Sequence, residues 1–183
     1  MKRGLPLATP GMTIGLFGGS FDPAHEGHAH VAETALARLK LDRVWWLATP
    51  QNPLKQASSP LSERIASARA MAHGPQMVVS DLEQQLGCRY TYQTLRALKR
   101  LYPGVRFTLI MGADNLRHFR KWKKWREVAA RVQVAVVSRP GFGPRERLSM
   151  PKGWIFLNAR HHPQSSTALR AKRTALAKRG RKC

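Results

Sequence analysis

A strand, a turn and a helix near the N-terminus form the pattern that most constrains the fold of this chain. Residues 13–17 are an apolar run that predicts a short buried strand, and residues 29–40 carry apolar side chains with the period of an amphipathic helix. A glycine-bearing turn at residues 18–28 joins them. In α/β proteins such a turn presents backbone N–H groups and the positive end of a helix to phosphate groups. The turn holds His25 and His28, whose i, i+3 spacing places them on one face of the first helical turn.

Further apolar segments and helical patterns alternate along the rest of the chain. We predict strands over residues 43–49, 77–80, 106–111, 133–137 and 154–157, helices over residues 60–73 and 91–102, a broken helical segment over residues 116–131, and a basic C-terminal helix. Strands that alternate with helices and are apolar on consecutive positions form a parallel sheet covered on both faces. With right-handed crossovers, we expect a single Rossmann-like α/β domain with a doubly wound parallel sheet. Ligands of such sheets bind at the carboxyl ends of the strands.

Local signals predict the boundaries of this domain and of one helix. Residues 1–11 are expected to be a flexible leader, residues 12–170 the domain, and residues 171–183 a basic tail or helix end. Ser59 as N-cap and Pro60 at the first helical position are expected to begin the second helix. Residues from Asp81 to Tyr90 are expected to form a polar connection.

Size, charge and cysteine usage narrow the class of protein. A chain of 183 residues is long enough for one domain with a full hydrophobic core. The formal charge of +22, from 32 Lys and Arg against 10 Asp and Glu, favours nucleotides, nucleic acid or a membrane surface as partners. The chain has no signal peptide pattern and no run of about 20 apolar residues, so we expect a cytoplasmic protein without a membrane span. Cys88 and Cys183 lack metal or redox spacing.

Two motifs, one near each end of the chain, resemble the signatures of the nucleotidylyltransferase superfamily. His25 and His28 match its His-x-x-His pair after a first strand, and the fuller string at residues 18–28 resembles its bacterial branch. Residues 165–170 resemble its second signature, Ser-Ser-Thr-x-Ile-Arg, with Leu169 in place of the usual Ile.

The middle of the chain resembles one family within that superfamily, the nicotinate-nucleotide adenylyltransferases. The resemblance rests on Gly112-Ala113-Asp114-Asn115, on Phe119, Trp122 and Trp125 at intervals of three, and on Arg139-Pro140-Gly141. It covers roughly residues 12–170. It implies transfer of the adenylyl group of ATP to nicotinate mononucleotide, giving nicotinate adenine dinucleotide (deamido-NAD) and pyrophosphate in NAD biosynthesis, with Mg²⁺ entering alongside ATP.

The same resemblance implies roles for individual residues. The catalytic residues would be His25 and His28, which would donate hydrogen bonds to the ATP phosphates. The ATP site would consist of Gly18, Gly19, Ser20, Phe21, His25, His28, Ser166, Thr167 and Arg170. The pyridine nucleotide would contact Lys55, Tyr90, Thr91, Gly112, Asp114, Trp122 and Arg139, with the pyridine ring stacked on Trp122 and the phosphate held by Lys55 and Arg139.

The residues themselves are compatible with this chemistry. The acceptor is a phosphate monoester with a second pKa of about 6, so it is ionised at neutral pH and needs no general base. Catalysis can then rest on alignment and on stabilising charge in an in-line transition state. The chain contains hydrogen-bond donors, cations and helix N-termini for this task, and no obvious Ser-His-Asp or Cys-His constellation.

Several alternatives stay open from the sequence. The acceptor could be nicotinamide mononucleotide or phosphopantetheine, and the charge alone would allow a nucleic-acid-binding protein. The histidines could bind a metal, although no Cys or carboxylate lies at zinc spacing around them. Trp122 could belong to the core and Asp114 could be a helix cap. The basic tail could be a solvated helix or contact nucleic acid or acidic lipids, and the protein could be a monomer or a homodimer.

Overall fold

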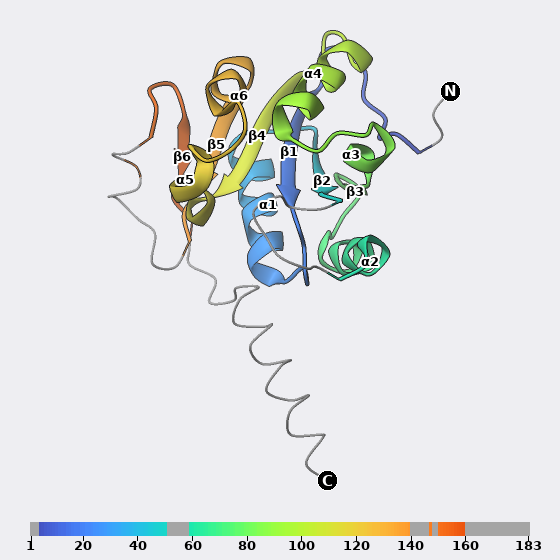
Figure 1. Cartoon of the computed structure of the whole chain (residues 1–183). Helices are drawn as coiled ribbons and strands as arrows, with labels where there is room; N and C mark the ends of the chain where they lie inside the picture. The colour runs from blue at the N-terminus through green and yellow to red at the C-terminus, as the bar shows by residue number, and fades with distance from the viewer. Residues whose placement is uncertain (1–3, 51–58, 140–146, 148–149, 160–183) are drawn as a thin grey trace.

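A six-stranded sheet lies at the centre of the molecule, between two layers of helices (Figure 1). The computed structural model describes residues 4–50, 59–139, 147 and 150–159. The strands are β1 (Thr13–Gly19), β2 (Arg43–Ala48), β3 (Met77–Ser80), β4 (Arg106–Gly112), β5 (Gln133–Val137) and β6 (Ile155–Leu157). The helices are α1 (Glu26–Arg38), α2 (Leu61–Met71), α3 (Leu82–Gln85), α4 (Thr91–Leu101), α5 (Ala113–Phe119) and α6 (Trp125–Arg131).

The sheet has the strand order β3-β2-β1-β4-β5-β6, and every neighbouring pair is parallel. This is the doubly wound order, in which the chain runs outward first to one side of β1 and then, from β4, to the other. The predicted Rossmann-like fold is therefore confirmed. The order reverses between β1 and β4, so a crevice is expected at the carboxyl ends of these two strands.

Successive strand residues contribute to different cores, because side chains in a strand alternate between its faces. On β2, for example, Trp46 packs in one core with α1 and α2, whereas its neighbour Trp45 packs in the other with α4 and α6. Both indole rings are fully buried. Burial on both faces explains why the strands are apolar on consecutive positions.

Three local expectations need correction. The polar connection at residues 81–90 contains the short helix α3, whose Leu82 is fully buried. The first helix begins at Glu26, earlier than the apolar period indicated, because His25 caps it. The second helix has Pro60 at its N-cap position without a side-chain cap. Instead of capping this helix, Ser59 donates its backbone N–H to the Asp22 carboxylate at 3.3 Å.

The described part of the expected leader is bonded to the domain. Tyr102 donates its hydroxyl to the Pro6 carbonyl at 2.7 Å, Arg43 donates to the Leu7 carbonyl at 3.1 Å, and the N–H of Gly11 donates to the carbonyl of Gly104 at 2.9 Å. The domain boundary at residue 11 stays a prediction. The predicted basic C-terminal helix lies outside the described residues.

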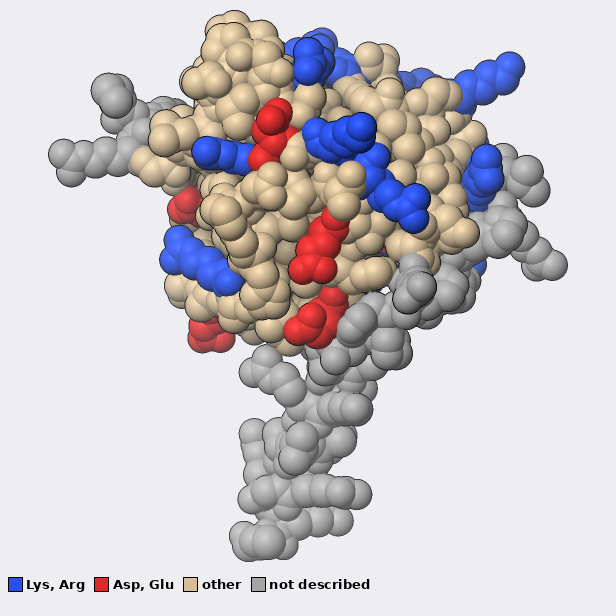
Figure 2. All heavy atoms as spheres, turned by 180° about the vertical axis from the view of Figure 1, so that it is seen from behind, with Lys and Arg blue, Asp and Glu red and all other residues tan. Residues whose placement is uncertain are grey.

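Basic and acidic side chains are interspersed on the face seen in Figure 2. They do not join there into one continuous basic surface of the kind that tracks a nucleic-acid backbone. Within the described residues, no helix combines the length and the apolar character that crossing a membrane requires.

Candidate active site

The residues that end β1 and β4 meet at the point where the strand order reverses. β1 leads into residues 20–25, here called the histidine loop, and β4 leads through Gly112 directly into α5. β1 and β4 pair in register up to Phe17 and Ile110, so these connections emerge side by side. The site predicted from the sequence therefore lies where a doubly wound sheet binds its ligands.

His25 and His28 are held by a reciprocal cap at the start of α1. The N–H of Gly27 donates to His25 Nδ1 at 3.0 Å, and the N–H of His25 donates to His28 Nδ1 at 3.3 Å. A nitrogen that accepts a hydrogen bond carries no proton, so each neutral imidazole bears its proton on Nε2. The rings lie together, with their centroids 3.9 Å apart. The cap thus fixes both tautomers as Nε2 donors, in the protonation pattern that suits hydrogen bonding to phosphate oxygens.

An aromatic cluster supports His28 from below. The ring of Phe21 packs edge to face against His28, with the centroids 5.2 Å apart, and packs in a tilted arrangement against Trp46, also at 5.2 Å. A Cβ on Gly19 would lie 2.9 Å from the Phe21 ring, whereas a Cβ on Gly18 would meet nothing within 4 Å. Gly19 is therefore required by Phe21, and Gly18 faces open space, as a residue beside a ligand would.

Asp114, Arg139 and Gly112 form a second cluster, at the carboxyl ends of β4 and β5. Arg139 Nε lies 3.5 Å from Asp114 Oδ1, and Arg139 Nη2 donates to the carbonyl of Gly27 in α1 at 3.2 Å. A Cβ at Gly112 would contact the Asp114 carboxylate and would lie 2.8 Å from Arg139 Nε. The structure thus brings three predicted pyridine-nucleotide residues together and bonds one of them to the first turn of α1.

Tyr90, Thr91 and Trp122 lie on the α4 side of the sheet. Tyr90 precedes Thr91, the first residue of α4, and Lys123 Nζ lies 4.7 Å from the Tyr90 ring centroid. Trp122 is half-buried and packs against Phe119 at 5.2 Å between ring centroids. Part of the Trp122 ring packs in the core and part is exposed, so its stacking on a ligand stays a prediction.

Two buried charged residues were missed in the sequence, Arg64 and Glu83. Arg64 is 2% exposed and donates to four backbone carbonyls. Its signal was its place on the apolar face of α2, at i+3 from Leu61 and i−4 from Ala68. Glu83 accepts a hydrogen bond from Thr94 Oγ1 at 2.9 Å, and burial raises the pKa of its carboxyl group above the ordinary value.

The second signature and one predicted phosphate ligand lie outside the described residues. These are Lys55, Ser166, Thr167 and Arg170. Within the described residues, no three or more His, Cys, Asp or Glu side chains gather closely enough to hold a metal ion.

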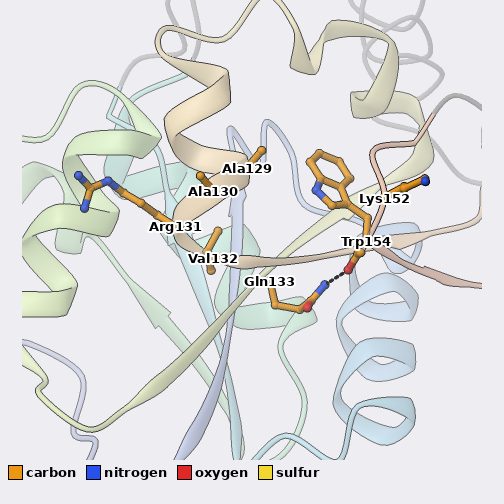
Figure 3. Close-up of a pocket in the computed structure, with 8 residues that line it drawn as sticks. Ala129, Ala130, Arg131, Val132, Gln133, Lys152 and Trp154 are labelled. Carbon is orange, nitrogen blue, oxygen red and sulfur yellow. Dashed lines mark hydrogen bonds between the residues drawn. The ribbon is translucent and has the colours of Figure 1, made fainter.

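A surface depression elsewhere in the molecule is unrelated to this site. It is lined by residues 129–133 and 152–154, around the start of β5, where Gln133 Nε2 donates to the carbonyl of Gly153 at 2.6 Å (Figure 3). The start of β5 is at the opposite end of the parallel sheet from the histidine loop.

Comparison with known proteins defines the class first. Residues 16–172 match the family model described as cytidylyltransferase-like. The matched range contains both histidines, the Asp114 cluster and the second signature, so the chain is a nucleotidyltransferase of the cytidylyltransferase-like class.

Individual relatives narrow the class. Nicotinate-nucleotide adenylyltransferase of Caulobacter sp. (strain K31) is 54% identical, over 91% of this chain and 88% of its own length. The protein of that name from Roseobacter denitrificans is 45% identical, over 94% of this chain and 98% of its own length. The chain belongs to the nicotinate-nucleotide adenylyltransferase family. Its fold matches the Plasmodium falciparum nicotinic acid mononucleotide adenylyltransferase complexed with NaAD, with a TM-score of 0.72, 18% identity and coverage of 87% of this chain and 83% of that one.

Proposed function

We propose that this protein transfers the adenylyl group of ATP to nicotinate mononucleotide, producing nicotinate adenine dinucleotide and pyrophosphate for NAD biosynthesis. The observation that carries the proposal is the pair of capped histidines with Nε2 donors at the switch point of the sheet. Membership of the family supports the choice of substrates. The Plasmodium falciparum protein of similar fold is described in complex with NaAD, and also with APC.

In this reaction a phosphate oxygen of the mononucleotide forms a bond to the α-phosphorus of ATP. The bond from that phosphorus to the bridging oxygen breaks, and its electron pair leaves with pyrophosphate. Negative charge grows on the phosphate oxygens during the transfer. His25 and His28 act by donating hydrogen bonds to those oxygens, and no residue needs to remove a proton from the ionised acceptor.

The ATP side of the site would be formed by the carboxyl end of β1 and the second signature. Gly18 leaves room for the adenylate, and Gly19, Ser20 and Phe21 shape the loop beneath it. In the second signature, the roles proposed from the sequence are phosphate binding by Ser166 and Thr167 and contact with the β- and γ-phosphates by Arg170. Mg²⁺ would enter with ATP as part of that substrate and neutralise charge on its phosphates.

The pyridine-nucleotide side would be formed by the carboxyl end of β4 and the start of α4. Arg139, which contacts Asp114 and the carbonyl of Gly27 in α1, is proposed to hold the mononucleotide's phosphate. Lys55 is proposed to assist it. Tyr90 and Thr91 at the start of α4 and the half-buried Trp122 are proposed to receive the pyridine ring.

The decisive experiment measures pyrophosphate release from Mg-ATP with three acceptors in parallel: nicotinate mononucleotide, nicotinamide mononucleotide and phosphopantetheine. We expect the highest kcat/KM with nicotinate mononucleotide. Preference for either other acceptor would reassign the substrate, and no release with any of them would refute adenylyl transfer. Binding to a nucleic acid without pyrophosphate release would favour the nucleic-acid-binding alternative. Analytical ultracentrifugation of the same sample would decide between monomer and homodimer.

A further inference from the structure

The guanidinium group of Arg64 is buried among backbone carbonyls of two connections, the one after β1 and the one between β2 and α2. Its Nε donates to Ser59 at 2.9 Å, Nη1 donates to both Ser20 and Thr49 at 2.8 Å, and Nη2 donates to Pro50 at 2.8 Å. The residue is 2% exposed. An arginine is seldom buried unless its charge is compensated, and carbonyl oxygens compensate it only in part. Burial lowers the pKa of Arg64, while the charge of Asp22 raises it.

These carbonyls belong to segments that the proposed reaction uses. Ser20 begins the histidine loop after β1, and Thr49 and Pro50 follow β2. Pro50 and Ser59 flank residues 51–58, the segment that contains Lys55. One side chain therefore ties the start of the histidine loop to both ends of the segment that carries a proposed phosphate ligand.

Ser67, one turn further along α2, contacts the other end of the histidine loop. Its Oγ accepts the N–H of Ala24 at 3.1 Å and lies 3.2 Å from the carbonyl of Phe21. Ala24 is the residue directly before His25. Helix α2 thus holds both ends of this loop through two side chains, Arg64 and Ser67.

Arg64 cannot itself be a phosphate ligand in this arrangement. Its bonds to the four carbonyls engage all three of its nitrogens, and almost none of its surface is exposed. Any effect of Arg64 on catalysis must therefore pass through the backbone that it holds. Small displacements suffice for such an effect, because an error of about 1 Å in alignment can lower a rate by about 100-fold.

We propose that Arg64 is a positioning residue for adenylyl transfer, which with Ser67 holds the histidine loop in a fixed relation to Thr49, Pro50 and Ser59. It thereby fixes where the chain enters the turn that carries His25 and His28, relative to the residues that follow β2 and precede α2. This inference rests on the proposed function, because Arg64 and Ser67 would serve to align the two substrates of that reaction.

The test compares variants of α2 in steady-state pyrophosphate release. Arg64→Lys keeps the charge but cannot reach four carbonyls, Arg64→Ala removes it, and Ser67→Ala removes one hydroxyl without touching a charge. Arg69→Ala is the matched control, because Arg69 lies on the same helix and is exposed. Thermal unfolding followed by circular dichroism gives the folded fraction of each variant, and kinetics are measured well below its midpoint.

Per folded molecule, we expect kcat to fall about tenfold or more in Arg64→Lys, further in Arg64→Ala and severalfold in Ser67→Ala, with a smaller change in KM for ATP. Arg69→Ala should stay within about twofold of the unchanged protein. A purely structural role would lower the folded fraction and leave kcat per folded molecule unchanged. That result in Arg64→Lys and Ser67→Ala would overturn the inference, even if Arg64→Ala failed to fold. The unchanged protein separates the two hypotheses: if it releases no pyrophosphate, adenylyl transfer itself is refuted.

Discussion

Two regions of this molecule use charged side chains in opposite ways. Around the histidine loop, the guanidinium of Arg64 is buried and bonded to neutral backbone carbonyls. Between α4 and α6, Arg96 is exposed and forms two hydrogen bonds with the carboxylate of Glu127, at 2.6 and 2.9 Å. Arg131 pairs with the same carboxylate at 2.8 Å.

The difference shows which region fixes geometry. Side chains that bond to buried backbone define where that backbone lies, and water cannot replace them without loss. Exposed ion pairs compete with water and salt, so their loss changes little. We therefore expect substitutions around the histidine loop to change turnover strongly and substitutions between α4 and α6 to change it weakly.

The largest effect should come from the histidines themselves. His25→Ala and His28→Ala should each lower kcat by about 100- to 1,000-fold, because each removes a donor to developing negative charge. Loss of the cap should cost only about 1 kcal/mol of stability, measured by urea unfolding. His73→Ala, at an exposed position after α2, is the control. A near-normal kcat in both variants would show that the histidines take no part in catalysis, and that the two regions do not differ in their effect on turnover.

Glu83 lies where the two regions meet and should give an intermediate effect that depends on pH. Its carboxylate is bonded by Thr94 of α4 and by Thr49 after β2, and burial raises its pKa above the ordinary 4.5. A carboxyl group whose pKa is higher in the folded state contributes stability below its unfolded pKa and loses that contribution as the pH rises through the folded pKa.

Glu83→Gln removes the ionisation and keeps an acceptor for Thr94. Relative to the unchanged protein, this variant should therefore gain in free energy of unfolding as the pH rises from about 4 to about 8. Urea titrations of both proteins across that range provide the measurement. If the difference in free energy of unfolding between the two proteins did not change with pH, Glu83 would ionise as readily in the folded protein as in the unfolded chain. The surroundings of Glu83 would then be as well hydrated as the α4–α6 surface.

The fold was predictable because its signals are local. The consecutive apolar residues of strands such as β4 can be read directly from the sequence. The spacing of His25 and His28 predicted that both side chains lie on one face of α1. Which imidazole nitrogen carries the proton was not predictable, because it depends on the backbone N–H groups of Gly27 and His25.

The set of hydrogen bonds from Arg64 to two loops was not predictable for a different reason. Its partners are backbone carbonyls up to 44 residues away, and a carbonyl carries no sequence signature. An arginine on an apolar helix face was the one available sign. Glu83 was missed for a related reason: its burial arises when α3 packs near Thr94, on the next helix, and near Thr49, which precedes it by 34 residues in the sequence.

The smallest effect should come from Glu127 on the α4–α6 surface. The hydrogen bond from Arg96, aided by the charges of Arg96 and Arg131, lowers the pKa of Glu127 below 4.5. The stabilisation is therefore present at neutral pH and is lost as the pH falls through the lowered pKa. Glu127→Gln should lower the midpoint of thermal unfolding slightly at pH 7, less so in high salt, and not at all once the carboxyl is protonated in both states. The kcat of Glu127→Gln should match that of the unchanged protein. A severalfold loss of kcat would show that the contacts between α4 and α6 also help to align the substrates. The two regions would then differ in exposure but not in role.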